Sequence, residues 1–316
     1  MASATQDPTQ PFASAALPRI IFVLGKGGVG RSTIATALGL VLAERGERAL
    51  VLEWAVGDCI APWFGAPAAG AAPVEIAPRL SVGNFSLDDA LRAYFVDHLH
   101  VGRIYRHVIR ARAVVRLLDV APGLAEMFFL GQLWWLITLA EREAGLVFDR
   151  IIVDAPATGH AASLLDVPAL VAEMAAGNLL AVETRRVTDL LADPARTGAI
   201  VVSLPEPLVL EETAELVPRL TARLGRPPLA LVVNRSAAAI AGDADRPPWL
   251  DALDARLSPP ARGALDALHA ELRAHVRVER ALRNSIPGPA IAIPELPGRA
   301  PLEVVRAAAR VLDEAP

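Results

Sequence analysis

Nine residues near the amino terminus could do chemistry by their types and spacing alone. Four of them are glycines, which let backbone N–H groups turn inward, and a following helix amino terminus would add partial positive charge that attracts phosphate groups. A serine near the end stands where such loops place a hydroxyl on Mg²⁺. The segment reads Gly25, Lys26, Gly27, Gly28, Val29, Gly30, Arg31, Ser32, Thr33. It predicts a phosphate loop rather than an ordinary glycine-rich turn, with residues 27–33 binding the nucleotide.

Two basic residues in this loop are unusual. The chain has 31 lysines and arginines, of which 30 are arginines, so Lys26 is its single lysine. Arg31 stands where a phosphate loop usually has lysine. Arginine keeps the charge but is bulkier, planar and forked, so it does not place a compact ammonium between the phosphates. We expect nucleotide binding to survive this exchange and hydrolysis to be weakened, whether Arg31 reflects drift toward arginine or an adaptation.

A carboxylate further along the chain could complete a metal site. Asp154 follows the apolar run 151–153, and the carboxyl end of such a strand would lie beside the phosphate loop. There an aspartate can hold a water of Mg²⁺, although an aspartate after an apolar strand is also common without any function. We expect Ser32 and Asp154 together to bind the metal.

These residues need a sheet that brings strand ends together. Apolar runs that predict buried strands cover residues 20–24, 49–52, 151–153, 199–202, 229–233 and 290–293. Segments with helical spacing cover 32–45, 161–192, 209–224, 260–283 and 302–312, and 55–78 is expected to be a loop. The alternation predicts an α/β fold with a doubly wound, mostly parallel sheet whose ligand lies at the carboxyl ends of the strands. Together with the phosphate loop after the first strand, it predicts a P-loop NTPase core.

Residues 87–145 depart from this alternation. Their period is helical throughout and shows no strand signal, which predicts an inserted helical subdomain. The stretch 128–137 is apolar on more than one face, which favours burial in a core or a dimer interface over an open groove for a client. We therefore expect one P-loop ATPase domain over 19–316, with its helical insertion at about 87–145 and a disordered tail at 1–18.

Composition excludes several classes of function. The chain has 316 residues and a formal net charge of −4, so no global positive field would hold it on nucleic acid or anionic lipid. Its one cysteine, Cys59, excludes intrachain disulfides and multi-cysteine metal sites and favours a reducing compartment. The first 18 residues resemble no signal or transit peptide, and no apolar stretch reaches the roughly 20 residues of a spanning helix. We expect a cytoplasmic protein without nucleic-acid partners or stable membrane insertion.

The early lysine makes the loop resemble a known pattern. Residues 26–32 are similar to the deviant Walker A motif KGGVGK[ST] of the family that includes the arsenical pump ATPase, the tail-anchored-protein targeting ATPases and the MinD-type and ParA-type switches. Residues 154–160, DAPATGH, resemble the DxxPTGH switch of its ArsA-like branch, the arsenical-pump and tail-anchored-targeting ATPases. Residues 205–213, 232–235 and 294–297 resemble further segments of that branch, so the resemblance covers about 19–312.

The resemblance implies ATP and Mg²⁺ as cofactors and a dimer that sandwiches the nucleotide. In that family the early lysine reaches across the dimer interface, which gives Lys26 a catalytic role at the partner's nucleotide. Asn234 matches a strand-end asparagine that binds adenine, and its amide has the donor and the acceptor that the N6/N7 edge needs. Without the resemblance, a helix cap or a turn residue would explain Asn234 equally well. In the targeting branch the helical region binds a client, so the resemblance also implies a protein client or partner at the helical insertion, against the core burial that residues 128–137 favour.

Other positions depart from the branch. Alanine, Ala55, stands near the place of the aspartate that orients the attacking water, and neither Glu53 nor Asp58 aligns convincingly as its replacement. With Cys59 alone, the chain has neither the cysteine triad that binds arsenite nor the CxxC that holds an interfacial zinc. We therefore exclude metalloid transport and a zinc-clamped dimer.

Three functions remain open. The first, which we favour, is an ATP-hydrolysing dimeric switch that couples nucleotide state to the helical region. The second, which Arg31 and Ala55 favour, is a non-hydrolysing nucleotide-binding subunit that forms a heterodimer with an active paralogue. The third is a MinD-like or ParA-like spatial regulator, which needs a basic carboxyl-terminal helix or a basic surface. Residues 301–316 hold two arginines against three acidic residues, which counts against the third.

Overall fold

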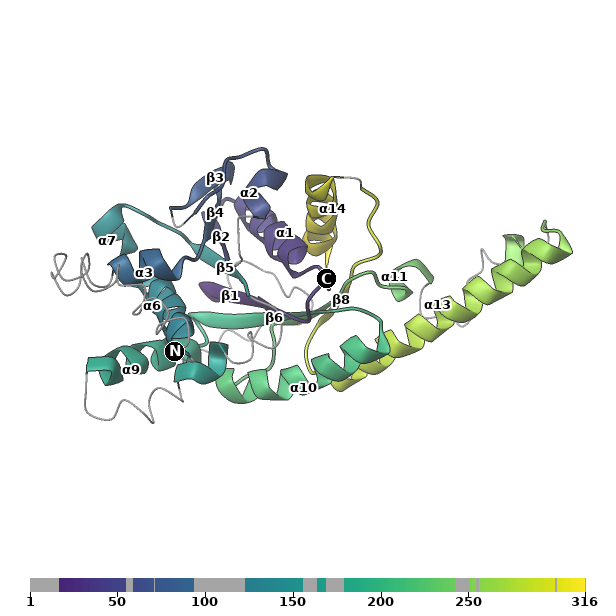
Figure 1. Ribbon diagram of the computed structural model, residues 1–316. Coiled ribbons are helices and arrows are strands. Elements are labelled where there is room, and N and C mark those ends of the chain that lie inside the picture. Colours follow the sequence, from purple (N-terminus) through teal and green to yellow (C-terminus); the bar gives the residue numbers. More distant parts are fainter. Residues whose placement is uncertain are drawn as a thin grey trace.

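The computed structural model describes residues 17–54, 59–70, 72–93, 123–155, 164–168, 179–241, 251–253, 256–298 and 300–315. The expected tail up to residue 16, the switch-like residues 156–160, Ala55 and Asp58 lie outside the described residues. The described parts form a sheet with helices packed against both of its faces (Figure 1).

Eight strands form one sheet in the order β3-β4-β2-β5-β1-β6-β7-β8. All neighbouring strands pair in parallel except β3 and β4. Apolar runs bury the central strands along their whole length, as a sheet covered on both faces requires. The strands are β1 (Ile20–Leu24), β2 (Ala49–Glu53), β3 (Val74–Ala77), β4 (Leu80–Asn84), β5 (Arg150–Asp154), β6 (Thr197–Ser203), β7 (Ala230–Val233) and β8 (Ala290–Ala292). The predicted doubly wound, mostly parallel α/β fold is confirmed.

The expected loop over 55–78 was wrong in two places. A short helix, α2 (Ile60–Trp63), packs Ile60 and Ala61 into the core, and the edge strand β3 pairs antiparallel with β4. A four-residue helix and a four-residue, half-exposed strand are too short to show a hydrophobic period among the surrounding alanines, glycines and prolines. Their formation depends on the neighbouring elements that they cover.

The sheet separates two hydrophobic cores. In β1, Ile21 and Val23 point into the first core, whereas Ile20, Phe22 and Leu24 point into the second. The first core is covered by α1 (Arg31–Glu44) and α14 (Pro301–Glu314). The second is covered by α6 (Leu124–Thr138), α9 (Leu179–Ala192), α10 (Pro207–Leu224) and the carboxyl-terminal end of α13 (Pro259–Ser285). The loop that leaves β1 therefore starts at the boundary between the two layers.

Helices fill the described part of the expected insertion. Residues 87–93 and 123–145 contain α3 (Leu87–Ala93), α6 and α7 (Ala140–Ala144) and no strand. The side chains of Phe129, Leu133 and Leu136 are buried in the second core, as the core interpretation of this stretch predicts. None of the described helices combines the length and the apolar character that crossing a membrane requires.

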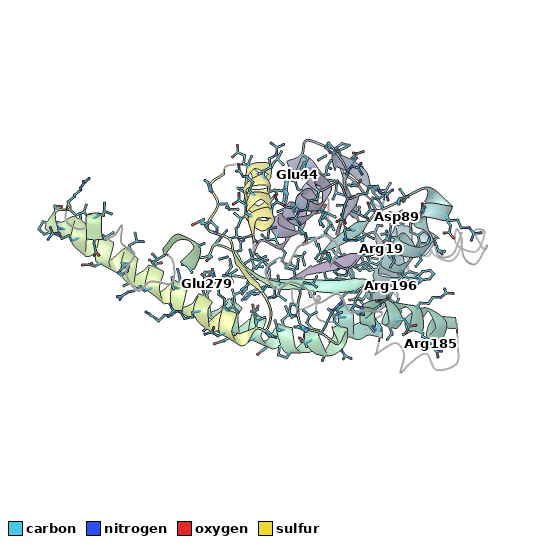
Figure 2. All side chains as sticks on the ribbon, turned by 180° about the vertical axis from the view of Figure 1, so that it is seen from behind. Arg19, Glu44, Asp89, Arg185, Arg196 and Glu279 are labelled. Carbon is cyan, nitrogen blue, oxygen red and sulfur yellow. The ribbon has the colours of Figure 1, made fainter. Side chains whose placement is uncertain are left out.

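Two polar side chains fasten outlying helices to the sheet, and both are labelled in Figure 2. Arg19, just before β1, donates hydrogen bonds to the carbonyls of Ile137 and Phe148, both at 2.9 Å, and so holds the end of α6. The long helix α13 reaches well beyond the sheet (Figure 1) and carries the fully buried Glu279. The Glu279 carboxylate accepts hydrogen bonds from Ser236, which precedes α11 (Ala238–Ala241), at 2.7 and 2.8 Å.

Candidate functional site

The phosphate loop connects β1 to α1, as its sequence predicts. Gly30 is the residue just before α1 and has a φ of 94°, a backbone conformation that side chains disfavour. A Cβ on Gly30 would also lie 2.4 Å from Nδ2 of Asn234, so any larger residue would have to displace that side chain as well. Within the loop Gly27 and Gly28 are exposed, whereas Val29 is buried. Thr33 is half-buried in the first turn of α1.

Ser32 and Asp154 meet at the carboxyl edge of the sheet. The Ser32 hydroxyl donates a hydrogen bond of 2.5 Å to Oδ2 of Asp154, which ends β5 and is 8% exposed. The parallel pairing of β1 with β5 sets this meeting, because Val23 and Asp154 are in register. Burial raises the pKa of the Asp154 carboxyl, and the Ser32 hydrogen bond and the Arg31 charge lower it in part. A buried carboxylate of this kind gains from a cation placed beside it.

These two oxygen atoms suit Mg²⁺. Magnesium prefers oxygen ligands in octahedral geometry at about 2.0–2.1 Å and usually takes one or two protein oxygens together with phosphate oxygens and waters. In the described part of the chain, no group of three or more His, Cys, Asp or Glu side chains could hold a metal ion by itself. A hydroxyl and a carboxylate at a phosphate loop therefore fit a metal that also needs phosphate oxygens.

Arg31 contacts the residue that follows β5. Its Nη1 donates a hydrogen bond to the carbonyl oxygen of Ala155, the residue after β5. Burial lowers the pKa of the Arg31 guanidinium, and the nearby Asp154 carboxylate raises it in part. The guanidinium is thus already engaged by the end of β5 at the position from which a loop lysine would reach the phosphates.

Lys26 contacts a different element, the helix α10. Its Nζ lies 2.7 Å from Oε1 of Glu212 on α10, and the two side chains are 29% and 36% exposed. The sequence predicted a role for Lys26 but no partner within its own chain. The two residues come together because α10 follows β6, and β6 lies next to β1 in the sheet.

Asn234 contacts the phosphate loop directly. It follows β7, and its Nδ2 donates a hydrogen bond of 2.8 Å to the carbonyl oxygen of Val29. Its Oδ1 accepts the N–H of Arg235 at 3.0 Å. The side chain therefore joins the end of β7 to the loop backbone, and its expected role at adenine stays a prediction.

Sequence reasoning gave no structural role to two residues here, Glu53, which ends β2, and Trp54, which follows it. Glu53 is 1% exposed and accepts the backbone N–H groups of Cys59 and Ile60 at 3.2 and 3.3 Å. This carboxylate therefore anchors the start of α2, although Glu53 is in register with Asp154 on the adjacent strand. The signal for this role was an acidic residue at the end of an otherwise apolar strand.

The other residue, Trp54, bridges the sheet and the helical region. Its N–H donates to the carbonyl oxygen of Asp154 at 3.4 Å. Its ring stacks on Phe129 of α6, with centroids 4.9 Å apart and planes 27° apart, and meets Phe85 edge-on at 5.1 Å. The Trp54 side chain thus contacts α6, while the Trp54 backbone contacts Asp154.

Comparisons with known proteins find related ATPases. The sequence profile of a protein family described as anion-transporting ATPase matches residues 18–177, which include the phosphate loop and Asp154. A curated relative, ATPase BagA of Mycobacterium tuberculosis, is 33% identical over 223 residues, which cover 69% of this chain and 65% of the relative. The chain therefore covers slightly less than two thirds of that relative.

More distant relatives carry the name arsenical pump-driving ATPase. One from Acidiphilium multivorum is 27% identical over 248 residues, which cover 69% of this chain and 39% of the relative. Another from Escherichia coli is 27% identical over 246 residues, with the same coverage of 69% and 39%. These matches extend the similarity beyond the loop and the strand that carries Asp154.

Proposed function

Because the chain belongs to the anion-transporting ATPase family, whose members are ArsA-like P-loop ATPases, we propose that it binds ATP with Mg²⁺ and hydrolyses it. The observation that carries this proposal is the 2.5 Å contact between Ser32 and Asp154 beside the glycine-rich loop. It supports the proposal because two oxygen atoms lie together beside the loop, and Mg²⁺ commonly takes one or two protein oxygens along with the phosphate oxygens of a nucleotide. The burial of the Asp154 carboxylate beside the loop supports a metal site over a merely structural glycine-rich turn.

Each residue of the site has its own part in the proposal. The backbone N–H groups of residues 27–33 hold the β- and γ-phosphates. Ser32 and Asp154 hold Mg²⁺, which when bound neutralises charge on the phosphates. Asn234 contacts adenine with its amide, and Lys26 stabilises the charge that develops on the nucleotide of a partner subunit. Arg31 occupies the place of the loop lysine and limits the rate, because its guanidinium is engaged by Ala155.

We further propose a dimer in which binding and hydrolysis of the nucleotide change the position of the helical region. Trp54 supports this coupling, since it contacts both the backbone of Asp154 and the ring of Phe129 on α6. A shift of the end of β5 at Asp154 would therefore be transmitted to α6 through Trp54. A protein client or partner is proposed to bind the helices that follow β4.

The test is to measure ATP binding by calorimetry and phosphate release with the purified full chain. We expect release that depends on Mg²⁺ and that Asp154→Asn abolishes. The matched control is Asp313→Asn, which removes a carboxylate that pairs with Arg45 on the surface. Intact ATP binding with no phosphate release would overturn the hydrolysis part of the proposal.

That outcome would favour a second function, a non-hydrolysing subunit that pairs with an active paralogue. The engagement of Arg31 by Ala155 is the observation that supports it. Purification from the native source, followed by mass spectrometry of the intact complex, separates the two, because a paralogue would appear as a second mass. Recovery of a homodimer alone would argue against this second function.

A spatial regulator of the MinD or ParA type has less support. The carboxyl-terminal helix α14 buries Val305, Ala308 and Leu312 in the first core against α1. Such a helix cannot lay its apolar face on a membrane without leaving that core.

A further inference from the structure

The single lysine of the chain is held by a carboxylate of the same chain. Lys26 and Glu212 make an ion pair of 2.7 Å, and each side chain keeps about a third of its surface in solvent. Arg31, the other cation of the loop, points toward Ala155 and Asp154 instead. The ammonium of Lys26 is therefore balanced by Glu212 and not by the metal-side carboxylate.

Both ends of this ion pair are fixed by their neighbours. At Gly25, a Cβ would lie 2.3 Å from the carbonyl oxygen of Val202, so the start of the loop presses against the end of β6. On α10, the buried Thr213 hydroxyl hydrogen-bonds to Ser203 at 2.9 Å and to the carbonyl oxygen of Val209 at 2.6 Å. Glu212 is next to Thr213, so its carboxylate is presented to Lys26 by a rigid turn of the helix.

The far end of α10 is also held. Asp166 accepts hydrogen bonds from Arg219 at 3.0 Å and from Arg223 at 2.5 Å. Asp166 belongs to the described segment 164–168, which packs Leu165 into the second core. With both ends of α10 fixed, Glu212 stays beside Lys26 unless the lysine itself leaves.

A phosphate group is a stronger partner for an ammonium than this carboxylate. Both contacts are charge-assisted, but an exposed ion pair with a carboxylate is weak because that partner carries one negative charge, whereas the phosphates of a nucleotide carry several. Lysine carries its charge on a flexible stem, so it can exchange one anion for another by rotating its side chain. The contact is thus strong enough to place Lys26 and weak enough to release it.

We propose that Glu212 is a positioning residue that holds Lys26 over its own loop until a nucleotide phosphate displaces the carboxylate. The inference rests on the proposed function, since the competing phosphate belongs to the nucleotide of the partner subunit that Lys26 is proposed to reach. The exchange makes Lys26 available to a nucleotide when one is present and neutralises it when none is. Glu212 acts through Lys26 and touches no reacting atom.

The composition of the chain permits a direct test of this contact. Reductive methylation with ¹³C-formaldehyde labels the Lys26 amine and the terminal amine, and no other side chain, because Lys26 is the single lysine. We expect Glu212→Gln to shift the NMR signal of methylated Lys26 and to remove its dependence on salt concentration. Glu211→Gln is the matched control on the exposed neighbouring position and should leave the signal in place. Addition of ATP and Mg²⁺ to the unmutated chain should move the signal away from its ion-paired position.

A second measurement links the contact to nucleotide binding. Glu212→Gln is expected to tighten ATP binding about 2–5-fold, the range that the loss of one exposed ion pair allows. The ATP affinity of Glu212→Asp should lie between those of the unmutated chain and Glu212→Gln. In a Lys26→Gln background, Glu212→Gln should have no effect on ATP binding. A merely structural role would change binding equally in both backgrounds, so that result would overturn the proposal, as would weaker binding by Glu212→Gln.

The two proposals fail in different ways. If the unmutated chain binds no ATP in calorimetry, the proposed function fails, and the exchange fails with it. If it binds ATP while the Lys26 signal stays unchanged by both ATP and Glu212→Gln, the positioning role alone is wrong. Circular dichroism of each variant at 25 °C checks that the fold is retained.

Discussion

The two sides of the phosphate loop are built differently. On the β5 side, Ser32 and Arg31 contact Asp154 and Ala155 in a mostly buried environment. On the α10 side, Lys26 and Glu212 form an ion pair that solvent reaches. Buried polar contacts are costly to break and fix geometry, whereas exposed ion pairs contribute little and exchange readily. One loop therefore combines a rigid side that suits metal binding with an adjustable side that suits contact with a partner.

The largest expected effect comes from the β5 side. Ser32→Ala removes the hydroxyl that faces Asp154, and we expect phosphate release to fall about 100-fold, because the charge stabilisation by a bound metal is worth several kcal/mol. Ser285→Ala, at the end of α13, is the matched control, and this variant should release phosphate at the rate of the unmutated chain. Less than a threefold loss would show that the buried side does not carry the metal.

Two glycines of the loop give the next largest effect. Gly28 and Gly30 have φ values of 85° and 94°, but a Cβ meets Asn234 only at Gly30. Gly30→Ala should therefore lower the free energy of unfolding by about 2 kcal/mol more than Gly28→Ala, as measured by urea denaturation. The difference should shrink in an Asn234→Ala background. Equal losses would mean that the contact between Asn234 and the loop is not tight.

Restoring lysine to the loop tests why Arg31 faces β5. Arg31→Lys frees the carbonyl of Ala155 and returns a compact ammonium to the phosphates. We expect phosphate release to rise about 10-fold, which corresponds to roughly 1.4 kcal/mol of transition-state stabilisation. Arg45→Lys, which keeps a charge beside Asp313 at the other end of α1, is the control. A fall in rate would indicate that Arg31 is adapted to its place.

The pH dependence of stability separates the buried side from an exposed carboxylate. The folded-state pKa of Asp154 is raised by burial, so its charged form costs stability as pH rises through that pKa. Asp154→Asn should therefore melt at a higher temperature than the unmutated chain at pH 7, and the gap should close as the pH falls toward the ordinary aspartate range. At pH 7 the Asp154→Asn variant would then be more stable than the unmutated chain but would release no phosphate.

Asp149 gives the control of opposite sign. Its hydrogen bonds with Arg48 lower its pKa to about 2, so the stability it provides is present at neutral pH and is lost as the pH falls through that value. Asp149→Asn should melt at a lower temperature at pH 7. If both variants moved in the same direction, burial would not be the cause of the Asp154 effect.

The smallest expected effect comes from a substitution on the α10 side of the phosphate loop. Lys26→Gln should change the free energy of unfolding by less than about 1 kcal/mol, because its ion pair is exposed. Arg283→Gln should cost more, since it removes a 2.6 Å partner from the fully buried Glu279. A large loss on Lys26→Gln would mean that both sides of the loop are structural.

The sequence predicted the parts of the site that depend on local pattern. The glycines of the loop, the strand before them and Asp154 after its apolar run all lie where their neighbours in sequence indicate. The direction of Arg31 and the partner of Lys26 depend on elements far along the chain, and no local rule specifies them. Glu53 was considered as a water-orienting group, but its carboxylate faces the start of α2, a helix too short to be predicted. The boundary of the helical insertion stays a prediction.

The strand order also has a consequence for the order of events during folding. β1 pairs with β5 and β6, at Ile151 and Thr197, so its partners lie more than a hundred positions further along the chain. Closing such large loops is slow relative to forming local contacts. During synthesis, the phosphate loop therefore emerges long before its neighbours, and the complete site is one of the last parts of the molecule to assemble. Nucleotide binding would then report that β5, β1, β6 and β7 have come together.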